Sequence, residues 1–205
     1  MPDSPPPSQA ATLTRKRPQP GERRAQILQT LATLLEQPGG ERVSTAALAA
    51  RLQVSEAALY RHYASKAQMF EGLIDFIEQS VFVLINQIQT HPLDSGSRQA
   101  GQIVTMLIRF AEKNPGMARV MVGDALLLEH ERLQQRMNLF FDKIEAALKQ
   151  CLRGEAGAPS SAAGLAQARA AVLVAFARGR LQRYARSGFK RLPSEQLDSC
   201  LALLL

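Results

Sequence analysis

The sequence predicts an all-α fold, and three observations carry that prediction. Apolar residues recur at the spacing of one helix face along most of the chain, no long stretch alternates polar and apolar side chains, and only 5% of the residues are aromatic. The prolines beyond residue 20 fall between the periodic stretches, beside Gly, Ser, Asp or Asn, and none interrupts one. We therefore expect helices joined by short connections.

Each periodic stretch sets the bounds of one expected helix. The longest opens at Ser65, whose hydroxyl can cap it while Gln68 completes a capping box. The last should bury its terminal leucines against the body or a second subunit, since a stripe of exposed leucines is unfavourable. The expected helices cover residues 22–36, 45–52, 56–62, 65–88, 97–113, 124–152, 165–187 and 194–205, with a turn-like piece over 115–123.

Residues 44–63 differ from the other helical stretches because a tight break separates two short helices. Leu52 of the first can pack against Leu59 of the second, and Ala49 is small enough to allow a close crossing. Ser55 can cap the second helix. This pattern is typical of a helix-turn-helix, whose second helix enters the major groove of DNA. Gln53 stands where the turn commonly has glycine.

A basic footprint coincides with this motif. Between residues 15 and 66 there are nine Lys and Arg against four Asp and Glu, so a quarter of the chain carries +5 of the net charge of +7. Basic residues gathered on a helix-turn-helix favour duplex DNA binding, because neutralised phosphates release their counterions. The alternative is a solvated charged face on a helical hairpin.

Candidate DNA contacts follow from position on the motif. Small residues at the start of the recognition helix allow close approach to base edges, and the polar residues around it suit guanine or phosphate. His62 could equally be a backbone contact or a helix-end cap, whereas Leu59 and Tyr63 are expected in the core. The candidates are Ser44, Thr45, Ser55, Glu56, Ala57, Ala58, Tyr60, Arg61, His62 and Lys66, with Arg15, Lys16 and Arg17 as an arm that is either simply disordered or able to reach the minor groove.

One recognition helix reads only a few base pairs, so such proteins usually bind palindromes as dimers. The dimer surface should come from the C-terminal helices, where the first half of 165–187 is rich in alanine. On the same helix Arg180, Arg183 and Arg186 form either a solvated face or a basic surface toward DNA or an acidic partner. We expect a disordered Pro-rich basic arm over 1–20, a helix-turn-helix domain over 21–66, and a helical dimerisation and partner-binding domain over 67–205.

Composition and motifs argue against several classes of protein. No apolar run approaches a membrane span and no charged-then-apolar leader opens the chain, so the expected location is the cytoplasm. Cys151 and Cys200 fit neither a disulfide framework nor a metal spacing and are expected to be buried thiols, and we expect no cofactor or metal. The three histidines, His62, His91 and His130, are scattered and no hydrolase or phosphate-binding motif is present, which argues against an enzyme.

Residues 24–66 resemble the DNA-binding domain of the TetR family, whose signature ends in a Tyr-x-His-aromatic-x-x-Lys run. Here that run is Tyr60, Arg61, His62, Tyr63, Ala64, Ser65 and Lys66. Residues 54–78, 110–138 and 189–193 are also similar to the nucleoid occlusion factors of that family. The resemblance implies a nucleoid-associated dimer of all-α subunits that binds palindromic sites dispersed over the chromosome. On DNA, such a dimer disassembles polymers of the tubulin-like division protein FtsZ.

The resemblance also implies where that partner binds. In the similar proteins the C-terminal tail of FtsZ enters a groove between the fourth and fifth helices, which here open at Ser65 and Ser97. The positions that match the groove are Phe76, Lys113 and Asn114, while Leu84 and Arg109 stand where the family pattern has a basic residue and a glycine. From the residues alone, Phe76 is either a semi-exposed anchor or core, and Asn114 is either a groove residue or a helix cap.

A ligand-responsive repressor is the main alternative function. Such a protein needs polar groups that converge inside the C-terminal bundle, where a small molecule would shift the separation of the two reading heads. The expected core positions between residues 97 and 152 are Ile, Leu, Met and Phe, which disfavours a ligand.

Overall fold

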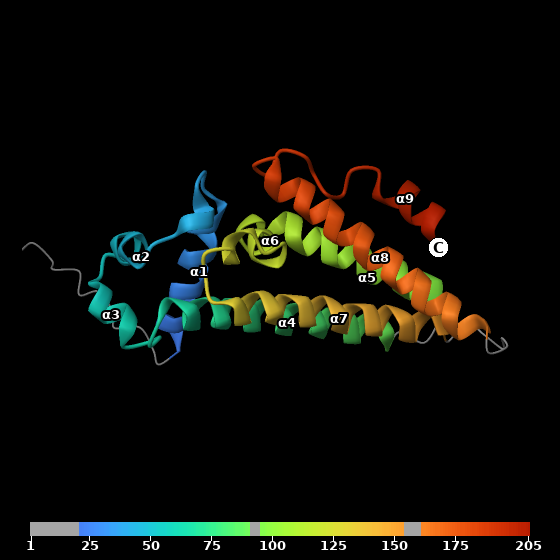
Figure 1. Cartoon of the computed structure of the whole chain (residues 1–205), viewed down its shortest axis with the longest axis horizontal. Helices are drawn as coiled ribbons and strands as arrows, with labels where there is room; N and C mark the ends of the chain where they lie inside the picture. Colours follow the sequence, from blue (N-terminus) through green and yellow to red (C-terminus); the bar gives the residue numbers. More distant parts are fainter. Residues whose placement is uncertain (1–20, 91–94, 154–160) are drawn as a thin grey trace, which may run out of the picture.

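A computed structural model describes residues 21–90, 95–153 and 161–205 (Figure 1). Over these residues the chain is helical and has no strand, which confirms the all-α prediction. The predicted arm, with Arg15, Lys16 and Arg17, and also His91 lie outside the described residues. The elements are α1 (Glu22–Glu36), η1 (Gly40–Arg42), α2 (Thr45–Leu52), α3 (Glu56–Tyr60), α4 (Lys66–Gln89), α5 (Gly96–Lys113), α6 (Pro115–Met121), η2 (Asp124–Leu126), α7 (Glu131–Arg153), α8 (Ser161–Arg186) and α9 (Leu197–Leu204), where η denotes a 3-10 helix.

Several of the expected element bounds are wrong. Helix α8 begins at Ser161 and not at residue 165, and α9 begins at Leu197 and not at residue 194. The piece over 115–123 contains a helix, α6, because Pro115 occupies its first turn, where the missing N–H of proline sacrifices no hydrogen bond. The expected 124–152 helix is interrupted after η2, and α7 begins only at Glu131. The recognition helix α3 ends at Tyr60, so Arg61 and His62 lie just beyond it.

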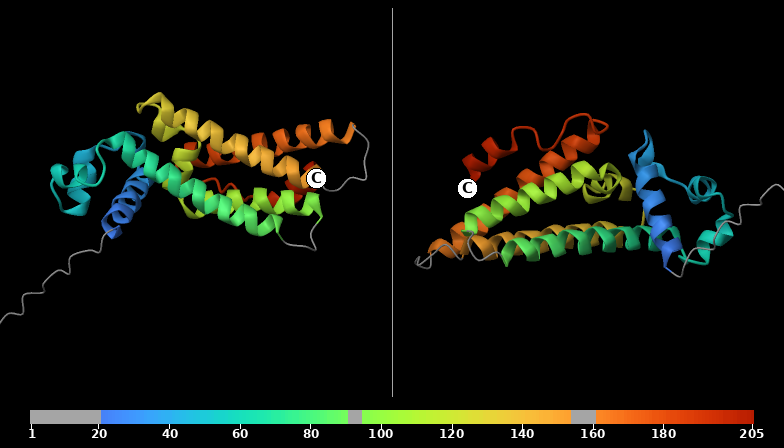
Figure 2. Two further views of the ribbon diagram at one scale, coloured as in Figure 1. Left: turned by 90° about the horizontal axis from the view of Figure 1, so that it is seen from below. Right: turned by 180° about the vertical axis from the view of Figure 1, so that it is seen from behind.

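The long helices form a two-layered body, and α1, α2 and α3 lie at one end of it (Figure 1). In Figure 1, α4 and α7 lie together in one layer and α5 and α8 cross in the other, and Figure 2 shows the same pairing from two further directions. Helices α1, α2 and α3 gather beyond the first turn of α4. The buried faces of the helices form one apolar core, and within the α4–α7 layer Phe140 of α7 packs edge-on against Phe82 of α4 and against its neighbour Phe141. Because α4 belongs to both parts, it connects them directly.

A close junction between α1 and α6 fixes the small end against the body. A Cβ atom added to Gly116 would lie 1.9 Å from the backbone oxygen of Ala32, so only glycine allows this approach. Next to it, Arg119 is 8% exposed, and its Nη1 donates to the backbone oxygens of Leu35 at 2.7 Å and Gln37 at 2.9 Å. Its guanidinium also stacks 4.8 Å from the ring centroid of Phe189. Arg119 is an exception to the expectation that the core positions between residues 97 and 152 are Ile, Leu, Met and Phe.

A series of ion pairs follows the seam between α4 and the segment that leads into α7. Most of these pairs join an acidic residue of α4 to a basic residue of α7. The pairs are Lys66–Glu129 at 2.5 Å, Glu71–Arg132 at 2.7 Å, Asp75–Arg136 at 2.6 Å, Glu78–Arg136 at 3.4 Å and Glu78–Lys143. The two carboxylates raise the pKa of Arg136, although partial burial opposes them as the largest single contribution.

The C-terminal helices leave apolar side chains uncovered. Leu197 and Leu201 of α9 are buried, but Leu203 is 87% exposed, and Leu165 and Val172 of α8 are also exposed. The last helix is expected to bury its leucines against the body or a second subunit, and within this subunit one face of α9 is buried. A surface of this kind is suited to a second subunit.

Two expectations about single residues of this region need correction. Cys151 is buried as expected, but Cys200 is only half-buried and accepts a hydrogen bond from Arg180 Nη2. Arg180 is not a solvated member of its stripe, because its Nη1 donates to the backbone oxygen of Glu195 at 2.6 Å. Arg183 and Arg186 are exposed. Among the helices that the structure describes, none has the length and apolar character needed to cross a membrane.

Candidate nucleic-acid interface and partner groove

The helix-turn-helix is assembled by serine caps and one left-handed residue. Ser44 Oγ accepts from the N–H of Ala47, and Ser55 Oγ accepts from the N–H of Ala58, so each serine begins a helix. Gln53 ends α2 at φ 56° and ψ 46°, which is the conformation that glycine commonly supplies in such turns. Local chemistry therefore sets the angle between α2 and α3.

The recognition helix divides into a buried face and an exposed face. Leu59 and Tyr63 are 1% and 3% exposed, which confirms that they belong to the core, and the guanidinium of Arg24 stacks 4.5 Å from the Tyr63 ring centroid. The exposed side carries candidates for base and backbone contact, with Ala58 half-buried at its edge. The exposed candidates are Ser55, Glu56, Ala57, Tyr60, Arg61 and His62.

Two of the candidate DNA-contact residues are hydrogen-bonded to each other. Thr45 Oγ1, at the start of α2, donates to Glu56 Oε2, at the start of α3, at 2.6 Å. The bond ties the two helix starts together and positions the Glu56 carboxylate over the first turn of α3, where the helix dipole favours a negative charge. Ser44 and Ser55 use one oxygen lone pair as caps, and a hydroxyl in this arrangement can still donate to a phosphate.

Lys66 stands at the first position of α4. Ser65 Oγ accepts from Gln68 N, and Gln68 Oε1 accepts from the N–H of Ala64, one residue earlier than a standard capping box would place it. Lys66 Nζ lies 2.5 Å from Glu129 Oε1 and 5.7 Å from the Phe70 ring centroid. The lysine is thus paired within the chain.

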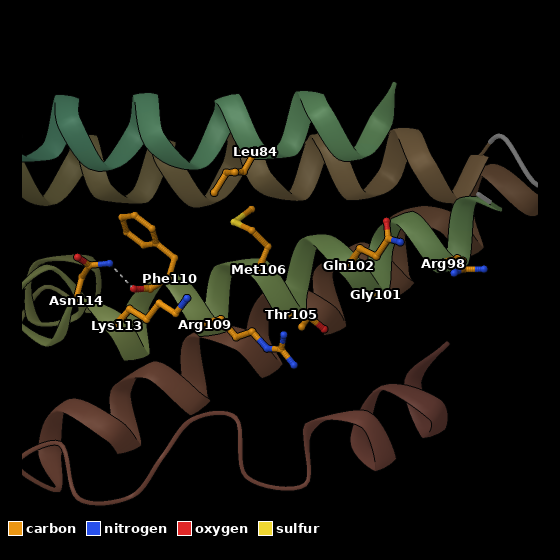
Figure 3. Close-up of a pocket in the computed structure, with 10 residues that line it drawn as sticks. All are labelled: Leu84, Arg98, Gly101, Gln102, Thr105, Met106, Arg109, Phe110, Lys113 and Asn114. Carbon is orange, nitrogen blue, oxygen red and sulfur yellow. Dashed lines mark hydrogen bonds between the residues drawn. The ribbon is translucent and has the colours of Figure 1, made fainter. Parts of the chain in front are cut away.

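A groove of about 600 Å³ lies between α4 and α5 (Figure 3). Its walls combine apolar side chains with three cationic ones, and no carboxylate is among the described residues that line it. Figure 3 shows the Leu84 and Met106 side chains extending into the space between the two helices. The lining residues are Leu84, Arg98, Gly101, Gln102, Thr105, Met106, Arg109, Phe110, Lys113 and Asn114. An extended, acidic peptide with apolar side chains fits this chemistry.

The three residues predicted for the partner groove occupy different places. Lys113 and Asn114 line it, and Asn114 Nδ2 also donates to the backbone oxygen of Phe110 at 2.7 Å, so this residue caps α5 as well. Phe76 does not line the groove, but it is 47% exposed on α4, two turns before Leu84, and hence is not core. Six further residues of α5 line the groove without having been predicted there: Arg98, Gly101, Gln102, Thr105, Met106 and Phe110. Their spacing of three and four along 97–113 was the available signal.

A metal site and an enclosed ligand cavity are two other kinds of site to consider among the described residues. No group of three or more His, Cys, Asp or Glu side chains is arranged to hold a metal ion there. The α4–α5 groove is open to solvent and is not an enclosed cavity inside the bundle.

Comparisons with known proteins agree over both halves of the chain. Residues 27–73 match the family described as "Bacterial regulatory proteins, tetR family", and residues 98–205 match "Tetracyclin repressor-like, C-terminal domain". The chain is 50% identical over 177 residues to the "Nucleoid occlusion factor SlmA" of Shewanella sediminis, which covers 86% of this chain and 89% of that protein. It is 47% identical over 178 residues to the protein of the same name from Idiomarina loihiensis, with 86% and 90% covered.

Solved structures share the fold at low sequence identity. A transcriptional regulator from Rhodococcus superposes with a TM-score of 0.71 at 20% identity, over 88% of this chain and 92% of that chain. The regulator FadR from Bacillus subtilis, in complex with stearoyl-CoA, superposes with a TM-score of 0.67 at 13% identity, over 88% and 96%. These likenesses concern the arrangement of helices.

Proposed function

Because this chain belongs to the SlmA group of the TetR family, whose members are DNA-binding regulators and not enzymes, we propose that it binds chromosomal palindromes as a homodimer and, when bound, antagonises FtsZ polymers over the nucleoid. A DNA-binding role in nucleoid occlusion follows from the family. Binding to palindromes, dimerisation and binding of the FtsZ tail are the parts that we propose. We assign residues 21–66 to DNA and residues 67–205 to dimerisation and the partner.

The exposed side of α3 supports the DNA half of the proposal. Tyr60, Arg61 and His62 are exposed together at its C-terminal end, and Ala57 presents only a methyl group at its start. An alanine methyl can contact a thymine methyl, and an arginine suits guanine or phosphate. The exposed leucines and valine on α8 and α9 supply a surface through which two copies can associate.

The α4–α5 groove is the feature that supports the second half of the proposal, binding of the FtsZ tail. It joins an apolar floor of Leu84, Met106 and Phe110 to the cations Arg109 and Lys113. An acidic tail segment would bury its apolar side chains on the floor while its carboxylates meet the cations. The half-exposed Phe76 lies on α4 toward the DNA-binding end and would extend that contact.

A chromosome-wide map of the protein in growing cells is the first test. Many palindromic sites, sparse around the replication terminus, are expected. Purified protein should then reduce the FtsZ polymer that sediments in the presence of GTP, and do so more strongly with a duplex that carries the mapped site. A single promoter site, or FtsZ polymer unchanged by the protein with its duplex, would instead identify a local repressor, and a ligand that raises the melting temperature would then be sought.

A further inference from the structure

We propose that Glu129 is an internal competitor of DNA phosphate for Lys66, and that this carboxylate therefore holds the DNA affinity and its salt dependence below what the basic surface alone would give. The inference rests on the proposed function, in which Lys66 contacts the DNA backbone. It assigns a DNA-tuning role to a residue outside the DNA-binding region, 63 positions along the chain.

The two residues meet where the body reaches the helix-turn-helix. Lys66 is the first residue of α4, directly after the α3 segment. Glu129 lies in the connection between η2 and α7, where its N–H donates to the backbone oxygen of Leu126. Lys66 Nζ and Glu129 Oε1 are 2.5 Å apart, and the side chains are 32% and 11% exposed. The lysine can thus be approached from solvent, whereas the carboxylate is largely enclosed.

The sign of this pair is reversed relative to its neighbours. Along the rest of the seam α4 supplies the carboxylates, Glu71, Asp75 and Glu78, and α7 supplies the cations. Only in the pair at the DNA-binding end, among the described pairs of this seam, does α4 supply the cation. The inversion brings a positive charge to the surface that carries α3, and it also places a carboxylate against that charge.

When Lys66 binds a phosphate, it therefore exchanges one anionic partner, Glu129, for another; it does not simply gain a partner. A lysine that moves from Glu129 to DNA leaves an 11% exposed carboxylate without its partner, and such a carboxylate must be hydrated or take up a cation. A free lysine contributes a slope of about −0.9 to log K against log salt when it neutralises one phosphate of duplex DNA. Here the cation taken up by Glu129 offsets the counterion released from the phosphate. Lys66 should therefore contribute little to the salt slope while Glu129 is present.

Glu129→Gln tests the inference, because glutamine keeps the shape and removes the charge. Binding to a fluorescent mixed-sequence duplex is titrated between about 50 mM and about 200 mM salt. The variant should bind about threefold to tenfold more tightly at the lower salt, and its slope should steepen by about 0.9. When Lys66 has been replaced by alanine, adding Glu129→Gln should increase the DNA affinity and the salt slope much less than it does in the wild type. Glu129→Asp, which withdraws the carboxylate by one methylene, should show a smaller gain and serves if the glutamine variant does not fold.

Glu78→Gln is the matched control. It also removes one carboxylate from the α4–α7 seam, but about 18 Å farther along α4, beyond the Debye length at these salt concentrations. Equal gains from Glu78→Gln and Glu129→Gln, or a gain that persists undiminished without Lys66, would show a general charge effect and overturn the inference. An unchanged affinity in a folded Glu129→Gln protein would overturn it as well. If the wild type itself binds no duplex, the failure lies with the proposed function.

Discussion

Arg119 of α6 donates from Nη1 to the backbone oxygen of Leu35, in the last turn of α1, at 2.7 Å. That turn contains no basic residue of its own, so the arginine supplies the cation that the negative end of the helix dipole favours. The same nitrogen reaches Gln37, and the guanidinium face meets Phe189. One side chain thereby links the end of α1, the body and the segment that follows α8.

Removing this link should destabilise the fold. Arg119→Met keeps much of the volume but leaves the backbone oxygens of Leu35 and Gln37 without this donor, and hydrogen bonds to charged groups contribute about 1.5 to 3 kcal/mol each. We expect the free energy of unfolding in urea to fall by about 3 kcal/mol. Arg132→Met, which breaks an ion pair whose arginine is 47% exposed, should change it by less than about 1 kcal/mol. Equal losses would contradict the assigned role.

Gly116 should tolerate no side chain. In Gly116→Ala the new Cβ would meet the backbone oxygen of Ala32 at 1.9 Å, so α1 and α6 must separate along their junction. We expect a loss of at least about 2 kcal/mol in thermal or urea unfolding. The control is Gly164→Ala in α8, where no atom lies within 4 Å of the added Cβ and helix propensity favours alanine by about 1 kcal/mol. A wild-type melting temperature for Gly116→Ala would refute the contact.

Arg61 should contribute one phosphate contact without supporting the fold. It is exposed just beyond α3, and no ion pair of Arg61 is among those described. Arg61→Ala should weaken duplex binding and reduce the steepness of the salt slope by about 0.9, while the melting temperature stays at the wild-type value. Arg153→Ala, at the far end of α7, should leave the slope unchanged. Binding that does not respond to the loss of Arg61 would show that α3 docks in another orientation.

The groove and the DNA-binding surface should be separable by mutation. Lys113→Glu reverses a charge of the groove wall, and Phe76→Ala removes an exposed ring whose loss should disturb the core little. Both variants should bind duplex DNA with wild-type affinity yet leave FtsZ polymers intact in a sedimentation assay. Arg153→Glu makes the same charge reversal away from the groove and should retain both activities. Loss of DNA binding together with the FtsZ effect would place Phe76 or Lys113 in a structural role.

The two cysteines should differ in reactivity with pH. Burial raises the pKa of the Cys151 thiol, and Gln89 and the backbone oppose the shift only in part, so less of it is thiolate at a given pH. Iodoacetamide at pH 8 should label half-buried Cys200 first, and both should react in urea. Because the native pKa lies above the unfolded one, the unfolded chain loses this proton first, and the corresponding stability falls as pH rises past about 8.5. Faster labelling of Cys151 in the native protein would contradict this order.

Local chemistry made much of the fold predictable from sequence. Ser55 and Ser65 were recognisable as helix caps because their side-chain bonds span only three residues, and apolar spacing identified Leu59 and Tyr63 as core. The bounds of α1 and α2 also agree with those expected from apolar spacing.

Partners far apart in the chain were not predictable in this way. Arginine is a residue type usually found at the surface, and the burial of Arg119 depends on a hydrogen bond to a carbonyl 84 positions away. Glu129 meets Lys66 only because η2 and a short connection interrupt what the periodicity presents as one helix. For the groove, resemblance indicated Lys113 and Asn114, but the part of α5 that precedes them lines it only because of how α4 and α5 pack.

Helix α4 is also a rigid connection between the small end of the molecule and the groove. Its 24 residues form one uninterrupted rod of about 36 Å, with Lys66 at one end and Leu84 about 27 Å along it. A tilt of about 5° at the first turn displaces Leu84 by about 2 Å, and a separation of even 0.5 to 1 Å forfeits about a quarter to a half of a van der Waals contact. A change in the angle between the small end and the body would therefore alter the width of the groove between α4 and α5, with no change of fold needed in between.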